Sequence, residues 1–246
     1  MIPETPALIF SLAVILLAGF VRGYSGFGFS MIVVVSLSLI FPPAKIVPVI
    51  LMLEVTASAY LLPRIWRQVD WPSLGWLYIG VLAGTPLGVY LLATVPERPM
   101  RGAIAIVVIL LVGLLWRGFK LKKMPGKKMT IGTGILSGFT NGGAAIGGPP
   151  VILFYFSSPA GVATSRASII AFFFGTDILA GGICAYHGLV SGQTLILAVT
   201  YLIPLIIGIT LGSRSFIKSD PEAFRKKVML LLLIMSVAIL VRTAFG

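Results

Sequence analysis

The sequence predicts an all-α, polytopic membrane protein with two inverted repeats, each made of one broken re-entrant helical hairpin plus three transmembrane helices. Composition is the first reason: 58% of the 246 residues are hydrophobic and only 11% are charged, whereas a soluble domain has about a quarter of its residues charged. Long stretches such as 104–116, 195–211 and 228–241 carry no charge at all. Because about 20 apolar helical residues cross a bilayer, the chain has room for membrane spans and for little else.

An internal repeat is the second reason. Residues 19–23 (GFVRG) resemble residues 138–142 (GFTNG), and further glycine and arginine matches follow in the same order along the two halves. The most basic loop of the chain lies between the two sets of matches. We therefore expect a single membrane domain, with an N-terminal repeat at 1–118, a basic cytoplasmic linker at 119–129 and a C-terminal repeat at 130–246.

Each repeat is expected to open with an interrupted helical segment, at about 7–41 and 130–157. The first segment is longer than one span requires, and residues 22–28 in its middle (RGYSGFG) are rich in glycine, a poor helix former. The second contains Asn-Gly-Gly and then Gly-Gly-Pro-Pro within 141–150, where proline interrupts a helix. Ordinary spans are expected near 45–62, 73–94, 102–117, 165–187, 194–213 and 228–243.

Basic residues in the loops bear on whether each broken segment crosses the membrane or returns to the side where it started. If both return as hairpins, and the basic linker is cytoplasmic, most loop lysines and arginines lie inside the cell. If both cross fully, the basic residues divide evenly between the two sides. The positive-inside rule favours the hairpins, and three full crossings per half then orient the halves oppositely, as in many transporters. Full crossings remain the alternative.

The two breaks are the expected substrate site. Lipid cannot satisfy the backbone groups that a break leaves unpaired, so the breaks should be buried and face each other near the midplane. Helix N-termini at the breaks offer N–H groups and a partial positive charge, which suit an anion. Tight helix packing is the alternative role for the glycines. The expected substrate-binding residues are Arg22, Gly23, Tyr24, Ser25, Gly26, Gly28, Thr140, Asn141, Gly142, Gly143, Gly147 and Gly148.

Charged residues inside apolar segments are the other candidates. Arg22 costs about 2.5–3.5 kcal/mol to insert, so it needs a carboxylate, backbone carbonyls or a bound anion as partner, unless it extends to the membrane surface. Glu54 and Asp177 lie deep within spans at corresponding places of the two halves. Each acid either relays protons, pairs with Arg22 or Arg166, or ties two helices together by a hydrogen bond. Coupling or gating roles are therefore expected for Glu54, Asp177 and Arg166.

Composition also excludes several classes of function. The net charge of +12 comes from short loops between spans, so the expected partner is the lipid bilayer and not a nucleic acid. The single cysteine, Cys184, and the single histidine, His187, rule out a multi-Cys/His metal site. We expect no cofactor and no metal, and the scattered acids offer no cluster for a membrane-embedded enzyme. The oligomeric state is not indicated.

Residues 19–28 (GFVRGYSGFG), together with 137–143 (SGFTNGG) and 147–150 (GGPP), resemble the sulfite/sulfonate exporter family (TauE/SafE). The resemblance covers essentially the whole chain. It implies a multi-pass permease of a bacterial or archaeal cytoplasmic membrane, with sulfite, sulfoacetate or a related sulfur-containing anion as substrate. Arg166, within ATSRA, also resembles a family feature, and the hairpin topology puts it at the cytoplasmic mouth.

The resulting expectation is export of sulfite or an organosulfonate by alternating access, with Arg22 and the backbone of both breaks holding the oxyanion. The membrane potential favours expulsion of an anion by about 2.3 kcal/mol per charge per 100 mV. Proton coupling through Glu54 or Asp177 is the other driving force considered. The alternatives are an importer of a sulfur-containing or carboxylate anion and a gated anion channel.

Overall fold

A computed structural model describes residues 5–117 and 124–215, together with Leu230, Leu233, Ile234, Val237 and Val241, and every regular element in these ranges is helical. Five of the helices are long and apolar enough to cross a membrane. The prediction of an all-helical, polytopic membrane protein is therefore confirmed for this part of the chain. The candidate spans are Thr5–Tyr24, Pro43–Gln68, Trp71–Thr94, Val162–Tyr186 and Gly192–Arg214.

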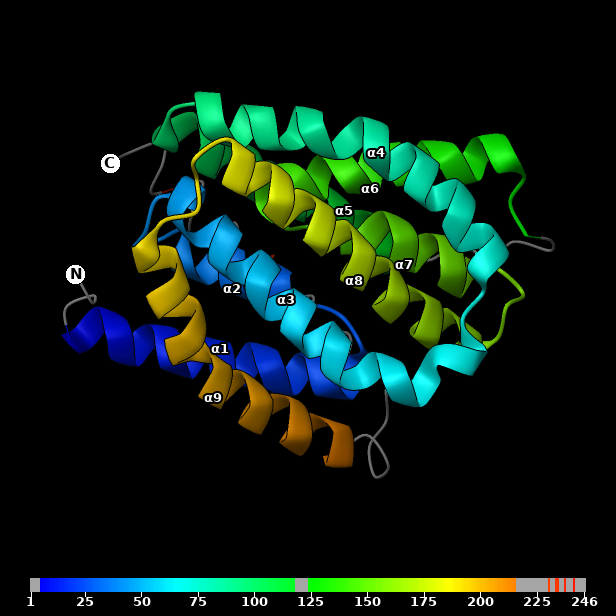
Figure 1. The fold of residues 1–246 in the computed structure, drawn as a ribbon, viewed down its shortest axis with the longest axis horizontal. Helices are drawn as coiled ribbons and strands as arrows, with labels where there is room; N and C mark the ends of the chain where they lie inside the picture. The colour runs from blue at the N-terminus through cyan, green and yellow to red at the C-terminus, as the bar shows by residue number, and fades with distance from the viewer. Residues whose placement is uncertain are drawn as a thin grey trace.

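The first half of the chain forms five α-helices and one short 3-10 helix (Figure 1). Proline opens α3 at its first residue and α4 at its second, positions where its missing N–H costs nothing. The elements are α1 (Thr5–Ser25), α2 (Phe29–Leu37), α3 (Pro43–Ile65), η1 (Trp66–Gln68), α4 (Trp71–Thr94) and α5 (Glu97–Arg117).

The described part of the second half forms α6 (Lys127–Ala144), α7 (Gly148–Ser157), α8 (Val162–Tyr186) and α9 (Gly192–Ser215). The ordinary spans predicted from the sequence correspond to α3, α4, α5, α8 and α9, and the span expected at 228–243 falls outside the described ranges. Because α6 begins at Lys127, the last three residues of the expected linker are helical.

Both predicted breaks are present, and each depends on left-handed backbone geometry. Gly26 and Gly28 between α1 and α2 have φ of 81° and 91°, which glycine adopts without steric cost. Ala145, after α6, has φ of 56°, a conformation costly for any residue with a Cβ atom. The Ala145 N–H donates to the Asn141 carbonyl at 2.7 Å, and the Ile146 N–H donates to Thr140 at 3.2 Å, which ends α6 with satisfied carbonyls.

Glycine seams join helices from the first half of the chain to helices from the second half. The α1 helix packs on α9, α6 packs on α4, and α3 packs on α8 between these pairs (Figure 1). A Cβ atom at Gly19 would lie 2.9 Å from the Leu205 carbonyl oxygen, and one at Gly138 would lie 2.9 Å from the Val81 Cα. The seam glycines, at which a Cβ would strike the facing helix, are Gly19, Gly23, Gly80, Gly84, Gly88, Gly134, Gly138, Gly142, Gly208 and Gly212.

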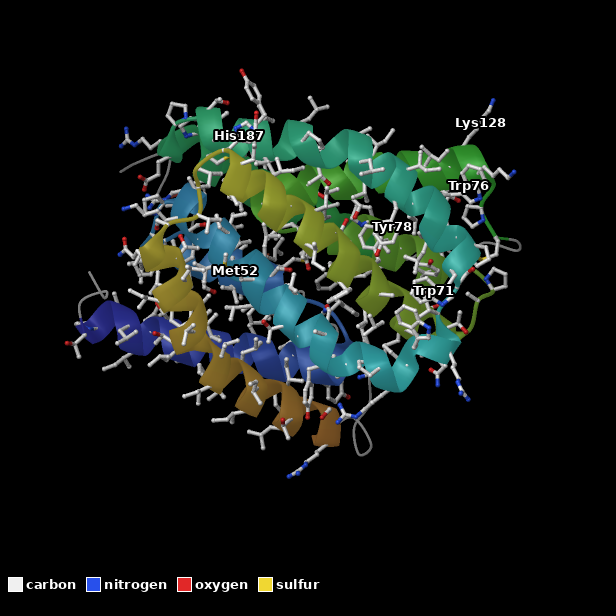
Figure 2. All side chains as sticks on the ribbon, viewed as in Figure 1. Met52, Trp71, Trp76, Tyr78, Lys128 and His187 are labelled. Carbon is white, nitrogen blue, oxygen red and sulfur yellow. The ribbon has the colours of Figure 1, made fainter. Side chains whose placement is uncertain are left out.

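The α3, α4, α8 and α9 helices run between two opposite faces of the bundle (Figure 1). Figure 2 shows Trp71, Trp76 and Lys128 at one face and His187 at the other. The α1, α3 and α9 helices all begin at the His187 face (Figure 1). The Arg101 Nη2, near the start of α5, donates to the Phe41 carbonyl at 3.3 Å, which ties the segment after α2 to α5.

Candidate functional site

Arg22 and Glu54 form a buried ion pair at the first break. The Arg22 Nη2 lies 2.9 Å from the Glu54 Oε2, with side-chain exposures of 0% and 1%. The Arg22 Nη1 donates to the Gly26 carbonyl at 2.7 Å and its Nη2 to the Ser58 hydroxyl at 3.0 Å. The Ser30 hydroxyl donates to the Glu54 Oε1 at 3.1 Å. Arg22 therefore has a carboxylate and a backbone carbonyl as partners, and its burial excludes a side chain that extends to the membrane surface.

The middle of the helix bundle holds both buried acids. Glu54 is the central residue of α3, and Asp177 follows the centre of α8 by about one turn. Both are 1% exposed. The two carboxyl groups interact electrostatically with each other, and Asp177 also interacts with Arg22. The acids thus belong to one buried polar region in the middle of the bundle.

Asn141 organises the second break in the way that Arg22 organises the first. Its Nδ2 donates to the Asp177 Oδ1 at 2.8 Å, and its Oδ1 accepts from the Gly147 N–H at 3.1 Å. The Ser137 hydroxyl donates to the Gly147 carbonyl. Asn141 and Arg22 each join the backbone of their own break to the acid of the following long helix.

Phe173 lies between the two breaks. The Arg22 guanidinium carbon is 4.7 Å from the centroid of the Phe173 ring, a distance that permits cation–π attraction. The Cζ of the same ring would be 3.0 Å from a Cβ atom at Gly148, the first residue of α7. Two breaks that are more than 100 residues apart in sequence therefore share one aromatic neighbour.

Arg166 approaches the first break from the second half of the chain. Its Nη2 donates to the Gly23 carbonyl at 3.3 Å. A Cβ atom at Gly26 would lie 3.1 Å from the Arg166 Cγ, so a glycine there leaves room for the arginine stem. Arg166 and Arg22 repel each other electrostatically, so the first break brings two guanidinium groups together.

The remaining predicted residues have local roles in the structure. Gly23 and Gly142 are seam glycines, so helix packing alone accounts for glycine at these two places. A Cβ atom at Gly143 would lie 3.4 Å from the Gly88 carbonyl oxygen, an ordinary contact distance. The Thr140 hydroxyl donates to carbonyls of its own helix. Tyr24 is buried and stacks on Phe20, with ring centroids 6.5 Å apart.

Two predicted residues remain to be placed, and two residues of the site were not predicted from the sequence. A side chain at Gly28 would approach the Val21 Cγ1 to 3.3 Å, and the Ser25 side chain is outside the described residues. Sequence reasoning missed Phe173 because it stands in a run of three phenylalanines typical of any apolar span. Ser58 had a signal, since it follows Glu54 by four residues and so shares its helix face. Within the described ranges, no three His, Cys, Asp or Glu residues gather as metal ligands.

Interrupted helices that bury charged groups inside an apolar bundle are typical of membrane transporters. A family model described as "Sulfite exporter TauE/SafE" matches residues 11–239, and the chain belongs to this family, whose members are transporters and not enzymes. The chain is 26% identical over 203 residues to the "Probable sulfite/organosulfonate exporter TauE" of Cupriavidus necator, a match that covers 78% of this chain and 77% of that protein. No solved structure matches the chain.

Proposed function

We propose that this transporter exports a small sulfur-containing oxyanion, sulfite or an organosulfonate of the sulfoacetate type, across the inner (cytoplasmic) membrane of a bacterial-type cell by alternating access. The family and the name of the Cupriavidus necator relative support the substrate class. The observation that carries the site is the meeting of both breaks around Phe173, beside the guanidinium groups of Arg22 and Arg166.

The two broken segments are re-entrant in this proposal, and the halves are inverted repeats. Support comes from the Arg101–Phe41 hydrogen bond that ties the segment after α2 to α5, and from the reciprocal pairing of α1 with α9 and of α6 with α4. The face with Trp71 and Lys128 is cytoplasmic, because described basic residues concentrate there. That face has Arg64, Arg67, Arg117, Lys127, Lys128 and Arg214, whereas the His187 face has Lys45, Arg98 and Arg101.

The oxyanion binds between the helix ends at the two breaks. The α2 helix starts at Phe29, and the Ile32 N–H is bonded to the Gly28 carbonyl, so the N–H groups of the three preceding residues have no acceptor within the helix. In α7, Pro149 and Pro150 carry no N–H, which leaves few donors at its start. The α2 end, with Arg22 and Arg166 nearby, therefore provides the stronger attraction for an anion.

Ligand-dependent thermal stability of the detergent-purified protein tests the site. Saturation at 100 times the dissociation constant stabilises a protein by about 2.7 kcal/mol, so a panel of sulfite, sulfoacetate, taurine, thiosulfate and short carboxylates should rank the substrates. The informative variant is Arg22→Met combined with Glu54→Gln, which removes the guanidinium without leaving Glu54 charged and alone. Arg64→Gln, which removes an exposed arginine away from the breaks, is the matched control.

We expect sulfur oxyanions to stabilise the wild-type protein and the Arg64→Gln variant, and not the double variant. Equal stabilisation of the double variant would remove Arg22 from the proposed site. Efflux of radiolabelled sulfite from proteoliposomes with an imposed membrane potential tests export itself. Flux that ignores the potential would exclude potential-driven export, and no flux of any sulfur oxyanion would reject the proposed substrate class.

A further inference from the structure

Asp177 is a buried acid without a counter-charge in the described part of the chain. Its side chain is 1% exposed. One carboxyl oxygen, Oδ1, accepts from the Asn141 amide, while Oδ2 is buried and has no hydrogen-bond partner among the described residues. An ionised carboxylate in such a place is very unfavourable, and a buried acid of this kind normally takes up a proton instead.

Comparison with Glu54 shows that Asp177 lacks a positively charged partner within the described ranges. Glu54 stands at the corresponding place of the first half and has the Arg22 guanidinium at 2.9 Å. The residue that matches Arg22 in the second half is Asn141, whose neutral amide donates a hydrogen bond but supplies no charge. The repeat therefore holds one acid as an ion pair and leaves the other with an amide partner only.

The groups that face Asp177 from neighbouring helices do not supply the missing charge. From α3 comes Glu54, which is negative, and from α1 comes Arg22, which Glu54 already binds. From α4 comes the Tyr78 hydroxyl, which donates to the Ala171 carbonyl at 2.7 Å, whereas Tyr90 on the same helix is exposed. The α6 helix contributes Asn141.

Other titratable groups on the surrounding elements lie away from Asp177. Tyr155 on α7 is electrostatically coupled to Asp70 and Tyr78. The Lys127 ammonium of α6 lies over the Trp76 ring at the cytoplasmic face. Arg67, on η1, is exposed near that face. On α8 itself, Arg166 contacts the first break and Cys184 is an uncharged buried thiol.

We propose that Asp177 is the proton-binding site of the transporter, and that the anion binds at the breaks only while Asp177 holds a proton. The second statement rests on the proposed function. Asn141 bonds both to Asp177 and to the Gly147 N–H of the second break. A charge on Asp177 therefore acts one hydrogen-bonded residue away from the anion site, where it repels the anion. Glu54, in contrast, has the Arg22 guanidinium as its partner at 2.9 Å.

A proton fits this site better than a metal cation. A sodium ion requires several oxygen ligands, and the nearest described side-chain partner of Asp177 is the Asn141 Nδ2, a donor. The other amide atom, Oδ1, is occupied by the Gly147 N–H. Asn is also the side chain that best imitates a protonated Asp, because it offers one acceptor oxygen and one donor group at the same positions.

Infrared spectroscopy of the purified protein without substrate tests the proton directly, whether or not the protein transports sulfur anions. At neutral pH, we expect the carbonyl band of a protonated carboxylic acid in the wild-type protein and in the Tyr78→Phe control. Asp177→Asn should remove this band without lowering thermal stability. Absence of the band from the wild-type protein at neutral pH, or its persistence in Asp177→Asn, would overturn the assignment.

Anion affinity measured against pH tests the linkage. Methanesulfonate is the probe, because it stays fully ionised and any pH dependence then belongs to the protein. Wild-type affinity should fall by up to tenfold per pH unit once Asp177 loses its proton, whereas Asp177→Asn should bind with the same affinity throughout. If the affinity of Asp177→Asn fell with pH as the wild-type affinity does, the linkage would be contradicted. Wild-type affinity that follows sodium concentration and not pH would also contradict it.

Discussion

Substituting Glu54 by glutamine removes one charge of the buried ion pair and leaves the Arg22 guanidinium without its counter-charge. At the observed 2.9 Å, two unit charges attract by about 6 kcal/mol at an effective dielectric constant of 20. Desolvation costs several kcal/mol for each ion, so the intact pair contributes little net stability, whereas removal of one partner costs about 3–5 kcal/mol. Glutamine has the same shape as glutamate and keeps an oxygen that accepts the Ser30 hydrogen bond, so the lost stability measures the effect of the missing charge.

A double-mutant cycle separates this charge effect from general damage to the core. Arg22→Met should cost a similar 3–5 kcal/mol because it strands Glu54, while the double variant should cost less than the two single losses together by at least about 2 kcal/mol. The assay is equilibrium unfolding in mixed micelles with increasing denaturing detergent. Two single losses below about 1 kcal/mol that add within about 0.5 kcal/mol would refute the buried ion pair as described.

Three other substitutions have defined outcomes in the same unfolding assay. Gly84→Ala should destabilise the protein by about 1–3 kcal/mol, since its Cβ would overlap the Ile135 carbonyl. The control is Gly75→Ala on the same helix, which has nothing within 4 Å of the new Cβ and should be neutral or stabilising. Equal losses in the two variants would argue against the seam. Ala145→Gly should stabilise by about 1 kcal/mol by relieving the left-handed alanine, and a loss would contradict this. Tyr78→Phe should cost about 1 kcal/mol through its bond to α8, and no loss would mean that the bond adds nothing.

Glycine and proline made the helix breaks predictable, because these residues act through the local backbone. The interruption expected within 22–28 falls at Gly26–Gly28, and the one expected within 141–150 falls at residues 145–147. The start of α5 was less predictable. The span was expected from 102, yet the helix begins at Glu97, where an ion pair between Glu97 and Arg101 at 2.5 Å supports a polar first turn that no hydrophobic pattern marks.

The candidate site was predictable only in part, because sequence does not state which helices become neighbours. The cost of burying Arg22 required a partner and left three kinds of partner open, and only the folded structure shows that Glu54 of α3 is the carboxylate beside it. Phe173 gave no signal for the same reason, since its role depends on α8 passing between the breaks. For Gly23, the sequence does not show whether glycine is needed for the backbone conformation or for close packing. The structure answers this, because a Cβ atom at Gly23 would strike the Ile209 backbone of α9.

The unequal polar ties at the two breaks indicate where movement is easiest in the proposed alternating-access cycle. The glycine seams join α1 to α9 and α6 to α4 by direct backbone contact, so each pair is expected to move as a unit against the central α3 and α8. The first break is tied to α3 by a charged pair, whereas the second is tied to α8 by the amide of Asn141. Hydrogen bonds to charged groups are roughly twice as strong as neutral ones. When Asp177 is protonated, the α6–α8 contact is therefore the weaker one, and we expect the α4–α6 unit to be the one that shifts.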